Sequence, residues 1–302
     1  MAVLKSCHQF TQLDQLDMAF TRNQIRSFQK QDYPADLYQF DKAARGVNGG
    51  FGKITTDHIQ HFQDHGYLIV NEAFDTNEIQ RGKKGIQNLV SQKYPDFRGL
   101  QIEPRLVKQQ RKLTVDERIH STRKAFNFLQ TEPLLKDLFY TPKLLKVVSK
   151  LLNDTPVHLQ DMALLKPANF GTEKPWHQDC AYFNFSLDVT IVGVWIALDE
   201  AKPENGCMHI VPGSHKKPKI HFKKRDWQIC DTDVDRKNDF FVPLRPGGVL
   251  FFHGLIHHGT PSNQSDQSRW ALQFHYRPQN AREISNDDRL SIFGSQGKDV
   301  DC

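Results

Sequence analysis

A histidine and an aspartate separated by one residue, His177 and Asp179, stand near the middle of this 302-residue chain. A second group of histidines, which includes His258, follows far downstream. Two imidazoles and one carboxylate are the ligand set that holds a catalytic Fe(II) ion and leaves coordination positions open for substrate and oxygen. If His177, Asp179 and His258 converge in the folded chain, the sequence predicts an iron-dependent oxygenase.

The His-x-Asp spacing is weak evidence by itself, because a chain with 14 histidines contains about one such triplet by chance. Its surroundings are more informative. The triplet follows Lys174-Pro175-Trp176 and precedes Cys180-Ala181-Tyr182-Phe183, which indicates the edge of a strand or a turn. Residues two apart can there point to the same side, so one face would present an imidazole and a carboxylate to one ion.

The third ligand has to come from a distant strand, and His253, His257 and His258 are all candidates. The first two are four residues apart, a spacing that binds zinc when both lie on one helix beside a catalytic glutamate. The segment is instead strand-like, is interrupted by Gly254 and contains no glutamate between the two histidines. We therefore favour His258, and interpret His253 as a core residue or as a support for the ligands.

Two further features downstream favour His258. It directly precedes Gly259-Thr260, and Arg269 follows on what should be the next strand. A guanidinium can hold a carboxylate through two parallel hydrogen bonds, so Arg269 could anchor an acidic ligand beside the metal.

Helical patterns dominate the first half of the chain. Threonines cap a segment that ends at Gly66, and Asp75 to Glu78 offers caps for a second segment. We expect helices over 55–66, from Asp75 to about Lys93 and from Glu132 to about Leu152, the last interrupted at Pro142. The apolar run 67–70 predicts a strand between the first two helices.

From Val157 onward the pattern changes to short apolar runs punctuated by Gly, Pro and Asn. Strands are expected over 157–165, 189–198, 208–211, 249–252 and 270–276. These observations predict an α+β fold, a double-stranded β-helix (jelly roll) core with N-terminal and flanking helices. We expect an N-terminal extension over 1–50, a catalytic domain over 51–285 and a C-terminal tail over 286–302.

The chain resembles the phytanoyl-CoA dioxygenase family of Fe(II)- and 2-oxoglutarate-dependent oxygenases between about Ile54 and Pro278. The resemblance depends on four motifs taken together. They are the entry 54–70, the segment 176–183 with the metal triplet, the run 205–215, and His258-Gly259-Thr260 with Arg269.

The resemblance implies His177, Asp179 and His258 as the iron ligands, with 2-oxoglutarate and O2 as co-substrates and succinate and CO2 as products. Because Asp179 occupies the carboxylate position, the resemblance favours oxygenation over halogenation. It implies further binding residues for 2-oxoglutarate, namely Arg269, Thr260, Met162, Trp195 and Lys124. Met162 and Trp195 could equally be core residues, and Lys124 is the least certain match, because we place it in a helical segment.

Tyr182 and Phe183 follow the triplet and could contact a substrate or pack beneath the loop. The substrate itself is where the sequence says least. We expect a small-molecule metabolite, amino-acid-derived or a natural product, that is oxidised at a C–H bond, most simply by hydroxylation. An acyl-CoA substrate of the phytanoyl-CoA type is the alternative. A zinc hydrolase that uses His253 or His257, and a non-catalytic binding module, are the alternatives from other classes.

The composition, 38% hydrophobic and 25% charged, is typical of a soluble globular enzyme. No apolar run approaches the roughly 20 residues of a membrane-spanning helix, and the N-terminus lacks the apolar core of a secretory signal. Five scattered cysteines without Cys-x-x-Cys spacing favour reduced thiols. We therefore expect a cytoplasmic protein with no membrane partner.

The net charge of +5 is mild. Basic residues gather between Ser214 and Arg225, in a run typical of a solvated loop that could also steer an anionic substrate. The run lacks the basic and aromatic pattern of a nucleic-acid surface, so we expect no nucleic-acid partner. The sequence does not predict an oligomeric state.

Overall fold

Two antiparallel sheets form the centre of the fold in the computed structural model, which describes residues 32–103 and 114–300. The larger sheet has the strand order β1 (Tyr67–Val70), β11 (Val249–His253), β6 (Val192–Ala197), β13 (Arg269–Pro278), β4 (Pro156–Lys166), β3 (Thr122–Phe126), β2 (Leu100–Ile102). The smaller sheet has the order β10 (Phe240–Val242), β7 (Met208–Val211), β12 (His257–Thr260), β5 (Lys174–His177). A separate hairpin consists of β8 (His221–Lys223) and β9 (Trp227–Ile229).

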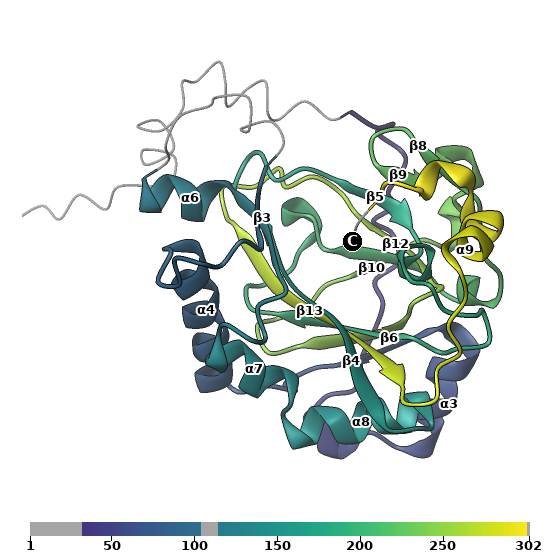
Figure 1. Cartoon of the computed structure of the whole chain (residues 1–302), viewed down its shortest axis with the longest axis horizontal. Helices are drawn as coiled ribbons and strands as arrows, with labels where there is room; N and C mark the ends of the chain where they lie inside the picture. The colour runs from purple at the N-terminus through teal and green to yellow at the C-terminus, as the bar shows by residue number, and fades with distance from the viewer. Residues whose placement is uncertain (1–31, 104–113, 301–302) are drawn as a thin grey trace, which may run out of the picture.

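Helices cover the larger sheet on one side, and the smaller sheet lies on its other side (Figure 1). The described helices are α3 (Thr56–His65), α4 (Thr76–Val90), α6 (Val115–Ser121), α7 (Pro133–Phe139), α8 (Pro142–Leu152) and α9 (Asn286–Phe293). The last of these lies apart from the others, beside the β8–β9 hairpin (Figure 1). Within the described ranges, none of them is long and apolar enough to cross a membrane. The two facing sheets form the double-stranded β-helix that the sequence predicts.

Local signals set the helix ends as expected. Thr55 is the N-cap of α3, and Gly66 ends it with a φ of 80°, a left-handed conformation that glycine adopts without strain. The Asp75 carboxylate accepts a hydrogen bond from the Glu78 backbone N–H at 2.9 Å, and the Glu78 carboxylate accepts one from the Asp75 backbone N–H at 2.8 Å. Pro142 is the first residue of α8, so the interruption predicted there is confirmed.

Both faces of the central strands of the larger sheet are covered, so most of their side chains are buried and apolar. On β13, Leu272, Phe274 and Tyr276 pack in the cluster that includes the helices, whereas Ala271 packs in the cluster between the two sheets. β6 alternates in the same way, with Val194 outward and Trp195 inward. Two-residue alternation therefore decides which side chains face the interior between the sheets.

The segment before α7 differs from the expectation. We placed Lys124 in a helical segment, but it lies on strand β3, directly opposite Leu164 of β4. Among the described residues between β2 and β3, Val115–Ser121 forms a helix, α6. The sequence Thr-Arg-Lys-Ala-Phe is short and charged, so it has little intrinsic preference for a strand. It forms one because it pairs with the long strand β4.

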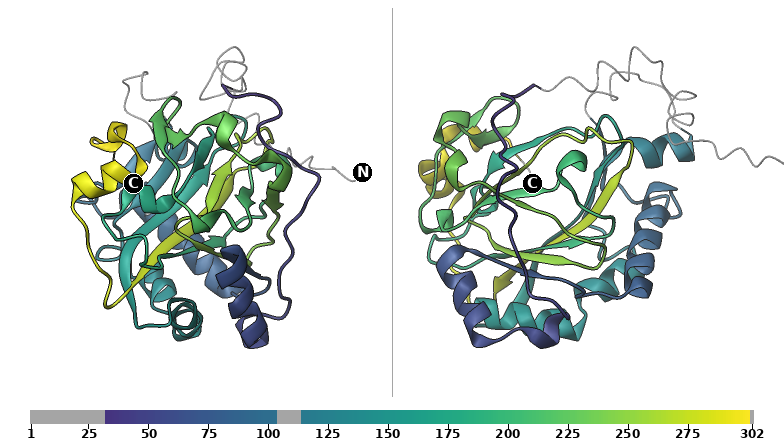
Figure 2. Two further views of the ribbon diagram at one scale, coloured as in Figure 1. Left: turned by 90° about the vertical axis from the view of Figure 1, so that its right-hand side faces the viewer. Right: turned by 180° about the vertical axis from the view of Figure 1, so that it is seen from behind.

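The described part of the N-terminal stretch, residues 32–50, runs across the outside of the smaller sheet (Figure 2). Leu37 and Tyr38 are buried there, and the Ala44 backbone donates a hydrogen bond to the carbonyl of Phe241 at 2.8 Å. At the other end of the chain, α9 buries Phe293. The division into extension, domain and tail stays a prediction.

Replacing Phe274 by alanine tests the outward face of β13. Phe274 is fully buried, and its ring lies 5.0 Å from that of Phe139 on α7. We expect Phe274→Ala to lower the free energy of unfolding by about 3–5 kcal/mol, because it leaves a cavity beneath the helices. Guanidinium unfolding in the presence of a chelator measures this without a contribution from bound metal.

The matched control is Phe222→Ala, since Phe222 is 44% exposed. A surface position of this kind should change the unfolding free energy by no more than about 0.5 kcal/mol. Equal effects of the two substitutions would contradict the assignment of Phe274 to the core.

Candidate metal centre

The three predicted metal ligands converge. His177 is the last residue of β5, His258 lies on β12, and Asp179 begins the 3-10 turn Asp179–Tyr182 that follows β5. β5 and β12 are paired antiparallel strands with His177 directly opposite His258. One potential ligand atom from each of the three buried residues lies within 4.8 Å of the other two.

Backbone carbonyls fix the orientation of both imidazoles. The Nδ1 of His177 lies 2.8 Å from the carbonyl oxygen of Pro175, and the Nδ1 of His258 lies 3.0 Å from that of Ile256. A carbonyl oxygen can only accept, so in both rings Nδ1 carries the proton and donates. Each Nε2 therefore presents a lone pair, as a metal ligand requires.

The carboxylate of Asp179 completes the triad. Its Oδ1 lies 3.2 Å from the Nε2 of His177 and 3.5 Å from the Nε2 of His258. Burial, followed by the neighbouring His258 and Lys174, lowers the pKa of His177 to about 3. Burial alone would raise the pKa of Asp179, but His258 and His275 outweigh it and hold the pKa well below its usual range. At neutral pH the pair is a neutral imidazole and a charged carboxylate.

This donor set fits a metal cation. Two nitrogen lone pairs and an anionic oxygen face a common point and would repel one another without a positive charge between them. Ligand atoms about 2.1 Å from one ion at right angles are about 3 Å apart, which is close to the separations of Oδ1 from the two Nε2 atoms. Two histidines and one carboxylate are the set that non-haem Fe(II) uses.

Arg269 lies in the same pocket with unsatisfied hydrogen-bonding capacity. Its side chain is 1% exposed, and its Nη2 donates to the carbonyl of Gly206 at 3.3 Å. Its Nε and Nη1 have no hydrogen-bond partner in the part of the chain that the structure describes. Burial lowers its pKa to about 10, so it stays charged at neutral pH. Buried donors without partners are costly, and a bound carboxylate would satisfy them.

Of the other residues predicted for the site, four line the pocket and two do not. Met162, Thr260, Lys124 and Tyr182 line the pocket together with the triad and Arg269. Trp195 does not line it: its ring lies 5.1 Å beneath the Arg269 guanidinium, between the sheets. Phe183 does not line it either, and packs edge to face against His275 at 5.2 Å. Trp195 thus lies behind the pocket residue Arg269, whereas Phe183 lies against His275, which contacts Asp179.

The alternative histidines are directed elsewhere. His253 ends β11, accepts a hydrogen bond from the Leu255 backbone at 3.1 Å, and its ring contacts the ring of His215 at 5.1 Å. His257 precedes His258 on β12 and points to the opposite face of that strand. Neither lines the pocket, and among the described residues the one cluster with metal-ligand spacing is His177, Asp179 and His258.

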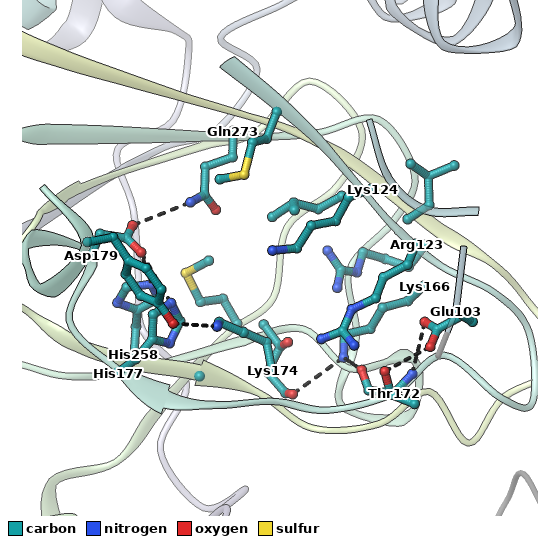
Figure 3. Close-up of a pocket in the computed structure, with 18 residues that line it drawn as sticks. Glu103, Arg123, Lys124, Lys166, Thr172, Lys174, His177, Asp179, His258 and Gln273 are labelled. Atoms are coloured by element: carbon teal, nitrogen blue, oxygen red, sulfur yellow. Dashed lines mark hydrogen bonds and ion pairs between the residues drawn. The ribbon is translucent and has the colours of Figure 1, made fainter. Parts of the chain in front are cut away.

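Basic residues line the end of the pocket away from the triad (Figure 3). Lys166 donates to the carbonyls of Thr172 and Pro261, both at 2.6 Å, and burial followed by the nearby Arg269 lowers its pKa well below its usual range. Arg123 also lines the pocket and donates to the carbonyl of Glu173 at 3.1 Å. This end of the pocket is suited to an acidic ligand.

Another cation lies beside the triad. The Nζ of Lys174 donates to the Tyr182 hydroxyl at 2.9 Å and to the Asp226 carboxylate at 2.7 Å. Burial lowers the pKa of Lys174, but Tyr182 and Asp226 outweigh it and raise the pKa overall. Lys174 and Tyr182 thus form one polar wall of the pocket next to His177.

Sequence reasoning missed two residues that contact the triad, Gln273 and His275. Both hydrogen-bond the second oxygen of Asp179, from Nε2 atoms at 3.4 Å and 2.7 Å respectively. A signal was present: Arg269, Gln273 and His275 are polar residues at even spacing within an apolar strand. Such a pattern places them on one face of the strand, from which Arg269 and Gln273 line the pocket and His275 contacts Asp179.

Comparison with known proteins agrees with this geometry. The sequence model of the phytanoyl-CoA dioxygenase (PhyH) family matches residues 62–271. A Danio rerio protein named phytanoyl-CoA dioxygenase domain-containing protein 1 is 35% identical over 153 residues, 48% of this chain and 53% of the relative. The chain thus spans about half the length of this curated relative. Phytanoyl-CoA dioxygenase of Bos taurus is 24% identical over 243 residues, 76% of this chain and 71% of the relative.

Solved structures share the fold. The enzyme EctD from S. alaskensis, determined with 2-oxoglutarate and 5-hydroxyectoine, superimposes with a TM-score of 0.62 at 19% identity, covering 88% of this chain and 91% of EctD. The alpha-ketoglutarate-dependent carbocyclase SnoK from nogalamycin biosynthesis gives a TM-score of 0.59 at 19% identity, covering 82% of this chain and 93% of SnoK. With the family match over more than half of its length, the chain belongs to the phytanoyl-CoA dioxygenase family.

Proposed function

We propose that this protein is an Fe(II)- and 2-oxoglutarate-dependent dioxygenase that oxidises, most simply by hydroxylation, a C–H bond of a small molecule. One observation carries the proposal: the His177–Asp179–His258 triad opens into the same pocket as the buried, incompletely hydrogen-bonded guanidinium of Arg269. A metal triad alone could serve several reactions. A triad with a carboxylate anchor in the same cavity suits a metal and an acidic co-substrate together.

Each residue has a defined task in this proposal. His177, Asp179 and His258 hold the ion on one side, Arg269 holds the distal carboxylate of 2-oxoglutarate, and Thr260 and Lys124 line the pocket beside it. Met162, Met208 and Leu164 form an apolar wall that limits the access of water. When bound, Fe(II) with 2-oxoglutarate supplies the activation of O2 and the oxidation of the substrate, with succinate and CO2 as products.

We infer a small-molecule metabolite as the substrate, amino-acid-derived or a natural product. The names of two structural neighbours support this class, since one is a carbocyclase of nogalamycin biosynthesis and another was determined with 5-hydroxyectoine. Tyr182 and Lys174 stand beside His177 and offer polar contacts to such a molecule. Phe183 would act indirectly, by packing behind the pocket.

An acyl-CoA hydroxylase is the second candidate. Arg123 and Lys174 line the pocket in addition to Arg269, and these cations suit an anionic substrate. Curated relatives named phytanoyl-CoA dioxygenase support the same class. The two candidates differ in whether the anionic group is part of a small metabolite or of a coenzyme A thioester.

We also propose a cytoplasmic location. Cys180, Cys207 and Cys230 are free thiols, as expected in a reducing compartment, whereas Cys7 and Cys302 lie outside the described residues. The Bos taurus relative is named as peroxisomal, so imaging of the tagged full chain against a peroxisomal marker is the direct test.

A turnover assay tests the proposed function. The iron-loaded protein, incubated with 2-oxoglutarate, O2 and pools of metabolites or acyl-CoA thioesters, should form succinate in proportion to a product heavier by one oxygen. Mass spectrometry of both products identifies which pool contains the substrate. Tight zinc in anaerobically purified protein, with no consumption of oxygen, would instead support a hydrolase.

Replacing Asp179 by alanine should abolish substrate-dependent formation of succinate, because the triad loses its only anionic ligand. The folded state should persist, since the change removes a carboxylate that lies in a cavity rather than an apolar side chain. Succinate assay and circular dichroism measure the two effects. Asp188→Ala is the control, because the Asp188 side chain is 72% exposed, and turnover retained by the Asp179 variant would rule out the assignment.

Replacing Arg269 by leucine should weaken 2-oxoglutarate binding by at least about 30-fold, since losing one partner of a buried charge pair costs roughly 2–5 kcal/mol. Calorimetric titration of the Mn(II)-loaded, anaerobic protein with 2-oxoglutarate measures the dissociation constant without turnover. Metal affinity should change little. Arg282→Leu, at a side chain that is 71% exposed, is the matched control, and equal 2-oxoglutarate affinity in both variants would contradict the role of Arg269.

A further inference from the structure

The two oxygens of the Asp179 carboxylate have different environments. Oδ1 faces the Nε2 atoms of His177 and His258, at 3.2 Å and 3.5 Å. Oδ2 faces away from them, toward the Nε2 of His275 at 2.7 Å and the side-chain amide of Gln273 at 3.4 Å. One oxygen is thus directed at the metal position and the other is held by protein donors.

Only one position of the proton on the His275 imidazole fits its surroundings. Its side chain is fully buried, and its Nδ1 has no hydrogen-bond partner among the residues that the structure describes. A proton on Nδ1 would be a buried donor without an acceptor, which is costly. The proton therefore belongs on Nε2, where it is donated to Oδ2 of Asp179 at 2.7 Å, the shortest of the contacts that the carboxylate makes.

Packing holds the imidazole of His275 in this position. Its ring meets the ring of Phe183 at 5.2 Å and that of Phe252 at 6.0 Å, both edge to face. Opposite His275 on β6 is Gly193, and a Cβ at that position would lie 2.2 Å from the Phe252 ring. The absence of a side chain at Gly193 leaves room for the Phe252 ring, which contacts the rings of both His275 and His258.

We propose that His275 is a positioning residue that restricts Asp179 to binding the metal through Oδ1 alone, with Gln273 as a second and weaker donor. This inference rests on the proposed function. A carboxylate with both oxygens free can bind an ion through both and occupy one of the positions that substrate and oxygen need. Hydrogen bonds to the outer oxygen of a ligating carboxylate prevent this and fix its orientation.

The test compares metal binding by variants that differ in the donor. His275→Phe keeps a ring between Phe183 and Phe252 but removes the Nε2–H group, whereas His275→Gln carries an amide donor near the same place. We expect His275→Phe to raise the dissociation constant for Mn(II), measured by calorimetry on the metal-free full chain, by about 10- to 100-fold. His275→Gln should restore most of the affinity.

Two further variants separate positioning from packing. Leucine is similar in volume to glutamine but has no hydrogen-bond donor. If His275→Phe fails to fold, the Mn(II) affinities of His275→Leu and His275→Gln can therefore be compared instead. His253→Phe removes another buried imidazole, one that lies outside the pocket, and should leave the affinity unchanged. The absorption bands of bound Co(II) should shift in the Phe and Leu variants and keep the parent positions in the Gln variant, because a second coordinating oxygen changes the coordination number of the ion.

Mn(II) affinities of the Phe and Leu variants within about twofold of the parent, with unchanged Co(II) spectra, would overturn the inference and leave the proposed function intact. The same holds if the Gln variant binds as weakly as the Leu variant. If the parent protein binds neither ion, or binds equally after Asp179→Ala, the proposed function itself fails.

Discussion

The register between β5 and β12 is the constraint on which the site depends. His177 and His258 are direct partners across this strand pair, and their ring centroids lie 4.1 Å apart. A slip of one residue would turn one imidazole to the opposite face of the sheet, where His257 now points. Because β7 pairs with the other edge of β12, the register is fixed from both sides. The metal centre is therefore a consequence of how the smaller sheet is assembled.

The larger sheet contributes polar side chains to the site. Strand β13 packs Leu272 and Phe274 against the helices, and its other face presents Arg269, Gln273 and His275 to the interior. The first of these three residues faces the basic end of the pocket and the other two contact Asp179. Burial of the outward face thus fixes the direction of every polar side chain on the inward face. The residues of β13 that pack in the core and those that form part of the site therefore lie on opposite faces of the strand.

Much of this could be predicted because the signals are local. Thr55 and Gly66 bound α3, Pro142 begins α8, and short apolar runs with β-branched and aromatic residues mark β6 and β11. The contacts of His275 could not be predicted in the same way, because they depend on strand register and on the turn that directs Asp179. β3 was missed for a related reason: its pairing with β4, rather than its own propensity, makes Lys124 part of a strand.

The pocket contains two buried cations at neighbouring positions, an arrangement that lowers stability. Arg269 and Lys166 are opposite each other on β13 and β4, both buried, and like charges at such positions are destabilising. Backbone carbonyls of Thr172 and Pro261 satisfy Lys166, but two nitrogens of Arg269 have no partner within the described ranges. In the proposed function, an acidic co-substrate would satisfy these two nitrogens and so remove part of the cost of burying Arg269. Affinity for the co-substrate and stability of the protein would then be coupled through the same guanidinium.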